Sequence, residues 1–121
     1  MKKIGFIGAY DKTDLIIYIA KILTTLKKKV LVIDATTKQK ARYVVPVINP
    51  TKMYVTEYEE IDIAVGFPNI EDIKRYLGYS EEQDLDYDIV LIDTDSIEGF
   101  SIFKLEESFK NYFVTSFDEK K

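Results

Sequence analysis

The sequence predicts an α/β fold in which a mostly parallel sheet carries helices on both faces. Short apolar runs of strand length alternate with segments whose apolar residues recur at helical spacing. The runs at 4–7, 30–33 and 89–92 are apolar or glycine throughout, as expected for strands buried on both faces. Strands that alternate with helices favour parallel pairing, because parallel strands need a long crossover connection.

The first strand is expected at 4–7, where Gly8 follows it in a tight turn. Thr13 or Asp14 can cap a helix, and the lysines at 27–29 suit its C-terminal end. The second strand, 30–33, ends at Asp34, so the three elements form a βαβ unit with an expected right-handed crossover. The apolar positions predicted to bury this helix are Leu15, Ile19, Ile22, Leu23 and Leu26.

The middle of the chain is less regular. Pro46 interrupts the apolar segment 43–47, and Asn49-Pro50 marks a turn. Strands are expected at 53–56 and 61–65.

The last third of the chain contains clearer signals. Asn69 can cap a helix that buries Ile70, Ile73 and Leu77 and ends near Gly78. The remaining expected elements are an acidic loop at 81–88, a strand at 89–92 that ends at Asp93, a short helix at 103–109 and a final strand at 112–115.

Composition limits the classes of function. At 121 residues, the chain is expected to form one α/β domain, 1–121. The net charge of −4 argues against direct binding to nucleic acid, despite basic patches at 27–29 and 38–42. Cysteine and histidine are both missing, so thiolate and imidazole chemistry is excluded and no metal site is expected. There is no transmembrane run and no signal-like start, so we expect a cytoplasmic protein.

The turn after the first strand resembles a phosphate-binding loop. Lys12-Thr13 lies between an apolar strand and a helix, where such a loop places its lysine and hydroxyl. A working loop also needs several glycines, one of them directly before the lysine. Here the turn is shortened to Gly8-Ala9-Tyr10-Asp11, so that an acidic side chain replaces that glycine.

Two further carboxylates are expected near this turn. Asp34 and Asp93 each follow a buried strand, and open parallel sheets bind ligands beyond the carboxyl ends of their strands. The candidate nucleotide site, which we interpret as vestigial, comprises Gly8, Asp11, Lys12, Thr13, Asp34 and Asp93. A structural interpretation stays open for each: Lys12-Thr13 can simply begin a helix, and strand-terminal aspartates often bond turn amides.

Together these segments resemble the MinD/ParA family of P-loop ATPases, which positions division sites, plasmids, flagella and secretion machines. Residues 30–35 look like the family's second strand, whose aspartate faces the hydrolytic water, and 87–94 look like its Walker B strand, whose aspartate supports Mg²⁺. Residues 111–116 are similar to the next strand. In active members the Lys-Thr pair matched by Lys12 and Thr13 binds phosphate and Mg²⁺. The resemblance covers most of the chain and implies a truncated P-loop NTPase-like, Rossmann-like fold, because family members usually continue for about another half domain.

The departures from the family pattern predict weak nucleotide binding. The family loop reads KGGxGKT, but this chain has no lysine between Lys3 and Lys12 and only one glycine in the turn. Asp95 stands where the family usually has proline. Each lost charge-assisted N–H bond removes about 1.5–3 kcal/mol. We therefore expect no catalytic residues and no cofactor, with ATP and Mg²⁺ as the ligands if the site functions.

The function expected from this resemblance is that of a non-catalytic or weakly nucleotide-binding protein. It would act as an assembly, localisation or regulatory factor through a protein partner or a homodimer that needs no ATP, and peripheral association with a membrane machine stays open. A second possibility is an active ATPase with a compressed loop that serves partitioning or positioning.

Two different classes of protein also stay open. In a receiver-like signalling domain Asp93 would be the phosphoacceptor, although Gly8-Ala9 stands where receivers need an acidic pair. In a dinucleotide-binding fold Gly5, Gly8 and Asp34 would form the site, although the GxGxxG spacing is missing.

Overall fold

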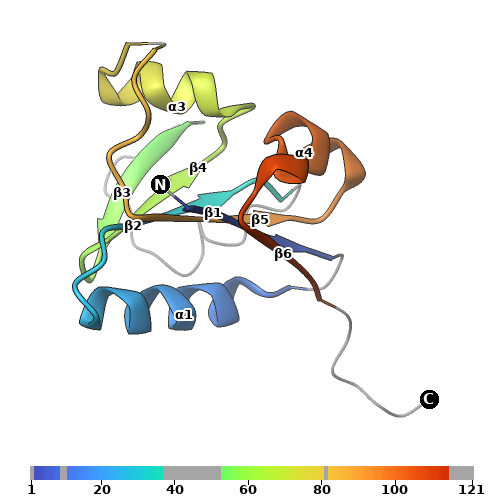
Figure 1. The fold of residues 1–121 in the computed structure, drawn as a ribbon, viewed down its shortest axis with the longest axis horizontal. Coiled ribbons are helices and arrows are strands. Elements are labelled where there is room, and N and C mark those ends of the chain that lie inside the picture. The colour runs from blue at the N-terminus through green and yellow to red at the C-terminus, as the bar shows by residue number, and fades with distance from the viewer. Residues whose placement is uncertain (1, 9–10, 37–52, 81, 115–121) are drawn as a thin grey trace.

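The computed structural model describes residues 2–8, 11–36, 53–80 and 82–114. Six strands form one sheet with the order β3-β4-β2-β5-β1-β6. Figure 1 shows α1 on one face of this sheet, with α3 and α4 on the other. The predicted α/β architecture with helices on both faces is confirmed. The elements are β1 (Lys2–Ile7), α1 (Thr13–Thr25), β2 (Val30–Asp34), β3 (Tyr54–Tyr58), β4 (Ile61–Val65), α3 (Ile70–Leu77), β5 (Ile89–Thr94), α4 (Ile97–Ile102), a 3-10 turn (Leu105–Glu107) and β6 (Lys110–Phe113).

The sheet is parallel except at one edge. β4, β2, β5, β1 and β6 pair in parallel, whereas β3 pairs antiparallel with β4. The two-residue turn between β3 and β4 places Glu59 and Glu60 at φ of 52° and 72°. Positive φ at both central residues is the backbone geometry that tight hairpins use.

The predicted βαβ unit is present, with one strand inserted into it. β1 and β2 run parallel on either side of β5, which pairs with both. As a result, the strand that ends in Asp93 lies between the strand that leads into the Lys12 turn and the strand that ends in Asp34. The carboxyl ends of all three strands therefore meet at one edge of the sheet.

Alternate residues of the central strands pack into two apolar layers, one on each face of the sheet. Val30 and Val32 of β2 pack toward α1, whereas Leu31 and Ile33 pack toward α3 and the segment that follows β5. All four side chains are buried. Burial on both faces explains why these strands are continuously apolar in the sequence.

The helix α1 buries a different face from the predicted one. Ile16, Ile17 and Ala20 form the buried face that packs on the sheet. Of the positions predicted to be core, Ile19 and Leu23 are half-buried, whereas Leu15, Ile22 and Leu26 are exposed. The helix is apolar on both faces, so its periodicity could not identify the one that packs on the sheet.

The predicted ends of α3 are confirmed. The Asn69 side chain accepts a hydrogen bond from Asp72 N at 2.8 Å, and Gly78 closes the helix with φ of 84°. These are the capping interactions that asparagine and glycine commonly provide.

The helix predicted at 103–109 forms earlier, at Ile97–Ile102, and only a 3-10 turn lies within the predicted range. Ser96 caps α4 by accepting a hydrogen bond from Gly99 N, and Lys104, at φ of 56°, prevents the helix from continuing. The last strand ends at Phe113, and Val114 continues its pairing by donating to Ile7 O.

Several sequence predictions lie outside the described residues: the basic patch at 38–42, the apolar segment 43–47, the turn at 49–50, and Ala9, Tyr10 and Thr115. Among the described helices, none is long and apolar enough to cross a lipid bilayer.

Candidate functional site

The Lys12 side chain is buried inside the candidate site. It follows β1 at the start of α1, and its side chain is only 2% exposed. Its Nζ lies 2.7 Å from Asp93 Oδ1 and donates hydrogen bonds to Gly8 O at 2.8 Å and Thr94 O at 3.1 Å. The ammonium group thus has two hydrogen-bond acceptors and one ion-pair partner within the protein. The cation therefore faces into the protein, bound to the ends of β1 and β5.

Asp93 is the acidic partner in this buried pair. Burial raises the pKa of its carboxyl to about 6, although the Lys12 ammonium acts in the opposite direction. The neighbouring carboxylates of Asp34 and Asp95 also raise the pKa of Asp93. Near neutral pH, the carboxylate is therefore costly to keep charged in the folded state, and Lys12 is the cation that compensates for it.

An acidic side chain holds the first amide of α1. Asp11 Oδ1 accepts a hydrogen bond from Thr13 N at 3.1 Å. An amide at a helix N-terminus is the kind of donor that a phosphate-binding loop offers to its ligand. Here the Asp11 carboxylate takes the place that a phosphate would occupy. The caps predicted at Thr13 or Asp14 are wrong, because Lys12 occupies the cap position and makes no side-chain cap bond.

Asp34 is buried at the end of β2, directly beside Asp93 of β5 in the strand register. Its Oδ1 accepts bonds from the backbone N and the Oγ1 of Thr36, at 3.0 and 2.6 Å. This is a local turn of the kind that aspartate commonly forms at the end of a strand. The bond to a turn amide that the structural interpretation expects for Asp34 is present.

Gly8 has a packing role. Its N–H donates to Thr94 O at 3.1 Å, so this amide already has an acceptor within the protein. A Cβ at this position would collide with the carbonyl oxygen of Val114, which follows β6. The glycine therefore lets the backbones after β1 and β6 approach closely, a requirement independent of any phosphate.

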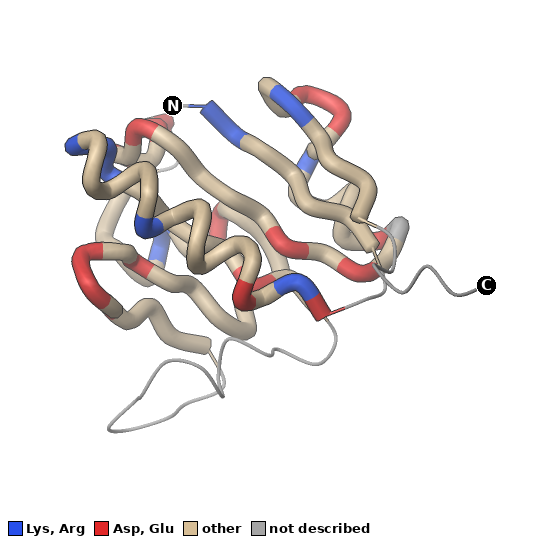
Figure 2. Tube along the Cα trace, turned by 90° about the horizontal axis from the view of Figure 1, so that it is seen from below, with Lys and Arg blue, Asp and Glu red and all other residues tan. Residues whose placement is uncertain are grey.

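The six predicted residues do lie near one edge of the sheet, and their charge is mainly negative. Figure 2 shows acidic positions at the ends of central strands and a basic stretch beside them at the start of α1. Asp93 pairs with Lys12, Asp34 lies beside Asp93 in the strand register, Asp11 directly precedes Lys12, and Asp95 follows β5. Among the residues that the structure describes, no group of three or more carboxylates is arranged to hold a metal ion.

Sequence reasoning missed Thr94. This residue is fully buried, and its carbonyl accepts hydrogen bonds from both the Lys12 ammonium and Gly8 N. It joins the turn after β1 to the end of β5. Because Thr94 directly follows Asp93, the sequence could have placed it near the site. The hydrogen bonds that its backbone carbonyl accepts could not be inferred from its residue type.

The strand order distinguishes this sheet from those of receiver domains and classic dinucleotide-binding domains. Flavodoxin-like sheets, the class to which receivers belong, have the order 2-1-3-4-5, and classic dinucleotide-binding sheets have the order 3-2-1-4-5-6. Both place the first strand beside the second. In this protein β5 separates β1 from β2.

The fold and site thus define a Rossmann-like α/β protein with a buried lysine–aspartate pair at the carboxyl ends of its parallel strands. Comparison of the chain with protein-family models, with curated proteins and with solved structures gave no match.

Proposed function

We propose that this chain is a non-catalytic or weakly nucleotide-binding MinD/ParA-like protein that acts in the cytoplasm as an assembly, localisation or regulatory factor through protein contacts. The observation that carries the proposal is the inward position of Lys12. Its ammonium has two hydrogen-bond acceptors and an ion-pair partner within the protein and is shielded from solvent. A lysine in this position is not presented to a phosphate.

Energetics support the same conclusion. A triphosphate could reach Lys12 only if the ion pair with Asp93 opened, and a buried carboxylate that loses its partner costs about 3–5 kcal/mol. Binding at the start of α1 would also displace Asp11 from Thr13 N. These losses would reduce a micromolar affinity by a factor of about a thousand, at 1.4 kcal/mol for each factor of ten.

Calorimetric titration with Mg·ATP tests the proposal. We expect no binding tighter than about 1 mM at neutral pH, for the native chain and for Lys12→Ala alike. Submicromolar binding that Lys12→Ala abolishes would contradict the proposal. Lys21→Ala is the matched control, because Lys21 lies further along α1, away from the candidate site, and its ion pair with Glu59 is exposed.

An active ATPase with a compressed loop is the second candidate. It is favoured by the convergence of Lys12, Thr13 and the two strand-terminal aspartates at one edge of the sheet. Steady-state release of phosphate from Mg·ATP, lost in Asp34→Ala and in Lys12→Ala, would support this candidate against the first.

A further inference from the structure

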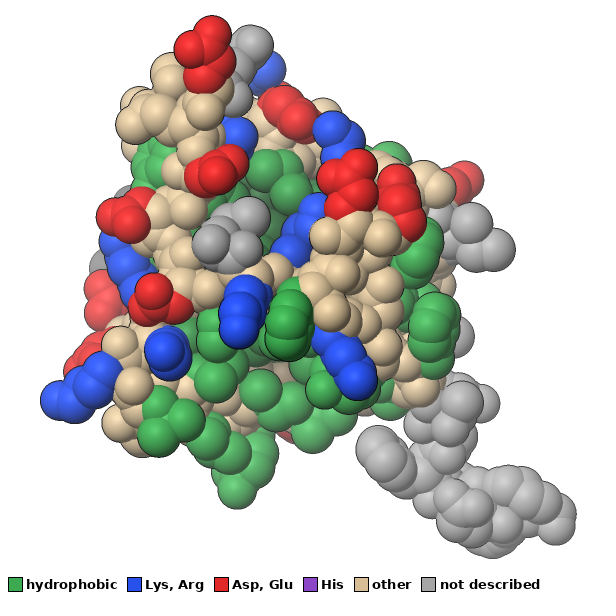
Figure 3. All heavy atoms as spheres, in the orientation of Figure 1, with side chains coloured by type: hydrophobic (Ala, Val, Ile, Leu, Met, Phe, Trp, Pro, Cys, Tyr) green, Lys and Arg blue, Asp and Glu red, His purple; other side chains and the backbone are tan. Residues whose placement is uncertain are grey.

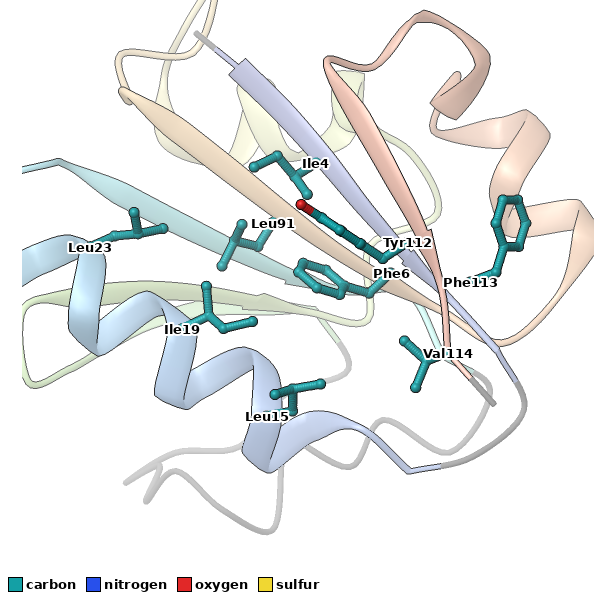
Figure 4. A pocket seen from close by; sticks show the side chains of 9 residues that line it. All are labelled: Ile4, Phe6, Leu15, Ile19, Leu23, Leu91, Tyr112, Phe113 and Val114. Atoms are coloured by element: carbon teal, nitrogen blue, oxygen red, sulfur yellow. The ribbon is translucent and has the colours of Figure 1, made fainter. Parts of the chain in front are cut away.

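An apolar groove runs along α1 on the side of the sheet that faces this helix. It has a volume of about 480 Å³, and none of the described residues that line it is charged. Figure 4 shows Leu15, Ile19 and Leu23 pointing from α1 toward the sheet, where Phe6 and Tyr112 lie. The ring centroids of these two aromatic residues lie 5.5 Å apart. The groove is therefore a preformed apolar surface between α1 and β6.

The groove exists because α1 covers only part of its face of the sheet. α1 packs mainly on β2, β4 and β5, and β6 is the edge strand beside β1. Strands of a parallel sheet are normally covered on both faces. In the part of the chain that the structure describes, α1 reaches Phe6 of β1 but no helix covers β6 on this side.

A second apolar stripe lies on the outside of the same helix. Tyr18, Ile22 and Leu26 follow one another at intervals of four residues and are 63%, 44% and 62% exposed. Figure 3 shows hydrophobic side chains gathered over the region of α1. A polar strip of Asp14, Lys21 and Thr25 also runs along α1, so the outer apolar stripe lies between this strip and the groove. We call the groove and this outer stripe together the α1–β6 surface.

We propose that the α1–β6 surface binds a second copy of this chain, with the two α1 helices antiparallel across a twofold axis. The surface consists of an apolar ridge, the outer stripe of α1, directly beside an apolar groove that follows the same helix. A twofold axis perpendicular to the surface would place the ridge of each copy in the groove of the other. Self-complementarity of this kind is what a symmetric dimer interface requires.

Charge favours a second copy as the occupant. Asp14 is exposed in the first turn of α1, whereas Lys110 is exposed at the start of β6. Lys110 lies on the groove side of β6, because its Nζ is 5.8 Å from the centroid of the Tyr112 ring. α1 runs opposite to the strands, so the acidic and basic residues lie at opposite ends of the surface. The twofold arrangement brings each Asp14 toward the partner's Lys110 and pairs opposite charges at both ends.

This inference rests on the proposed function, in which the protein acts through protein contacts, and it identifies the partner as a second copy of the chain. Sedimentation equilibrium of the full chain, over about 1–100 µM and without nucleotide, is the test. We expect a dimer. A chain that stays monomeric throughout this range would overturn the inference.

Ile22→Glu locates the interface. Glutamate is a good helix former, so α1 should persist in this variant, as checked by circular dichroism. Two carboxylates would enter the apolar interface, and we expect the dimer dissociation constant to rise about a hundredfold. Ile102→Glu is the matched control, because Ile102 is 49% exposed on α4, away from this surface. Equal effects of the two substitutions would overturn the assignment of the surface.

A charge exchange tests the antiparallel arrangement. Asp14→Lys and Lys110→Glu should each weaken the dimer, and the double variant should restore it, because opposite charges again meet. A double variant weaker than either single one would contradict the arrangement.

Repeating the measurement with Mg·ATP separates this inference from the proposed function. A dimer that forms without nucleotide supports the surface even if ATP is found to bind tightly, a result that would remove only the proposed function. A monomer that fails to bind ATP would remove only the surface. A dimer that forms only with ATP would contradict both.

Discussion

Replacing Lys12 by methionine measures how much the buried Lys12 ammonium contributes to the free energy of unfolding. The substitution keeps most of the apolar length of the side chain and removes the charge. Asp93, whose side chain is 5% exposed, then loses the cation that lies 2.7 Å from its Oδ1. Removing one partner of a buried ion pair costs about 3–5 kcal/mol, a large share of the roughly 5–15 kcal/mol that typically stabilises a domain.

The assay is urea unfolding followed by circular dichroism at pH 8. Lys21→Met is the control, because the Lys21–Glu59 pair is about half exposed and should contribute less than about 1 kcal/mol. The cost of Lys12→Met should decrease at pH 5, since the pKa of Asp93 is about 6 and its carboxyl is then mostly neutral. Adding Asp93→Asn to Lys12→Met should recover part of the loss, with a coupling energy of about 2–3 kcal/mol.

If Lys12→Met and Lys21→Met lower the free energy of unfolding equally at pH 8, the Lys12 ammonium is hydrated in solution. The lysine would then be available to a phosphate, and the argument for a closed turn would fail.

Three further predictions concern the same edge of the sheet. Asp11→Ala should lower the free energy of unfolding by about 1 kcal/mol, because Thr13 N loses its acceptor, whereas Asp11→Asn should cost much less; urea unfolding of both checks this. Gly8→Ala should destabilise the fold by about 1–3 kcal/mol in the same assay, since the new Cβ must displace the backbone at Val114, and an unchanged stability would contradict that contact. Burial raises the pKa of Asp93 from 3.8 to about 6, so the folded state retains a proton that the unfolded chain has lost in this range. The Asp93 contribution to stability should therefore fall by about 3 kcal/mol in total, about two-thirds of it as pH rises from 4 to 6, and Asp93→Asn should flatten this part of the profile of unfolding free energy against pH.

The sequence was most informative where one residue type has one dominant local use. Asn69 and Gly78 delimit α3 correctly because a side-chain cap and a left-handed glycine are determined within a few residues of the chain. The continuous apolar character of β2 and β5 identified strands buried on both faces. Convergence of Asp34 and Asp93 followed from the general geometry of parallel sheets.

The orientation of individual side chains could not be predicted in this way. Lys12 was expected in a phosphate-binding turn, but its inward orientation depends on Asp93 and Thr94, which are more than eighty residues away along the chain. The wrong face of α1 has a related cause. Both Ile16 and Ile22 fit a helical apolar period, and only the tertiary structure determines which of them packs on the sheet.

Two-dimensional NMR can follow the backbone amides of Gly8 and Thr13 and the Lys12 ammonium during a titration with Mg·ATP, and so test whether the turn after β1 is closed to phosphate. The account predicts that these signals stay in place up to millimolar nucleotide, because each donor already has an acceptor inside the protein. Saturable movement of all three signals at micromolar nucleotide would show that the turn opens to receive a triphosphate, and would contradict the account.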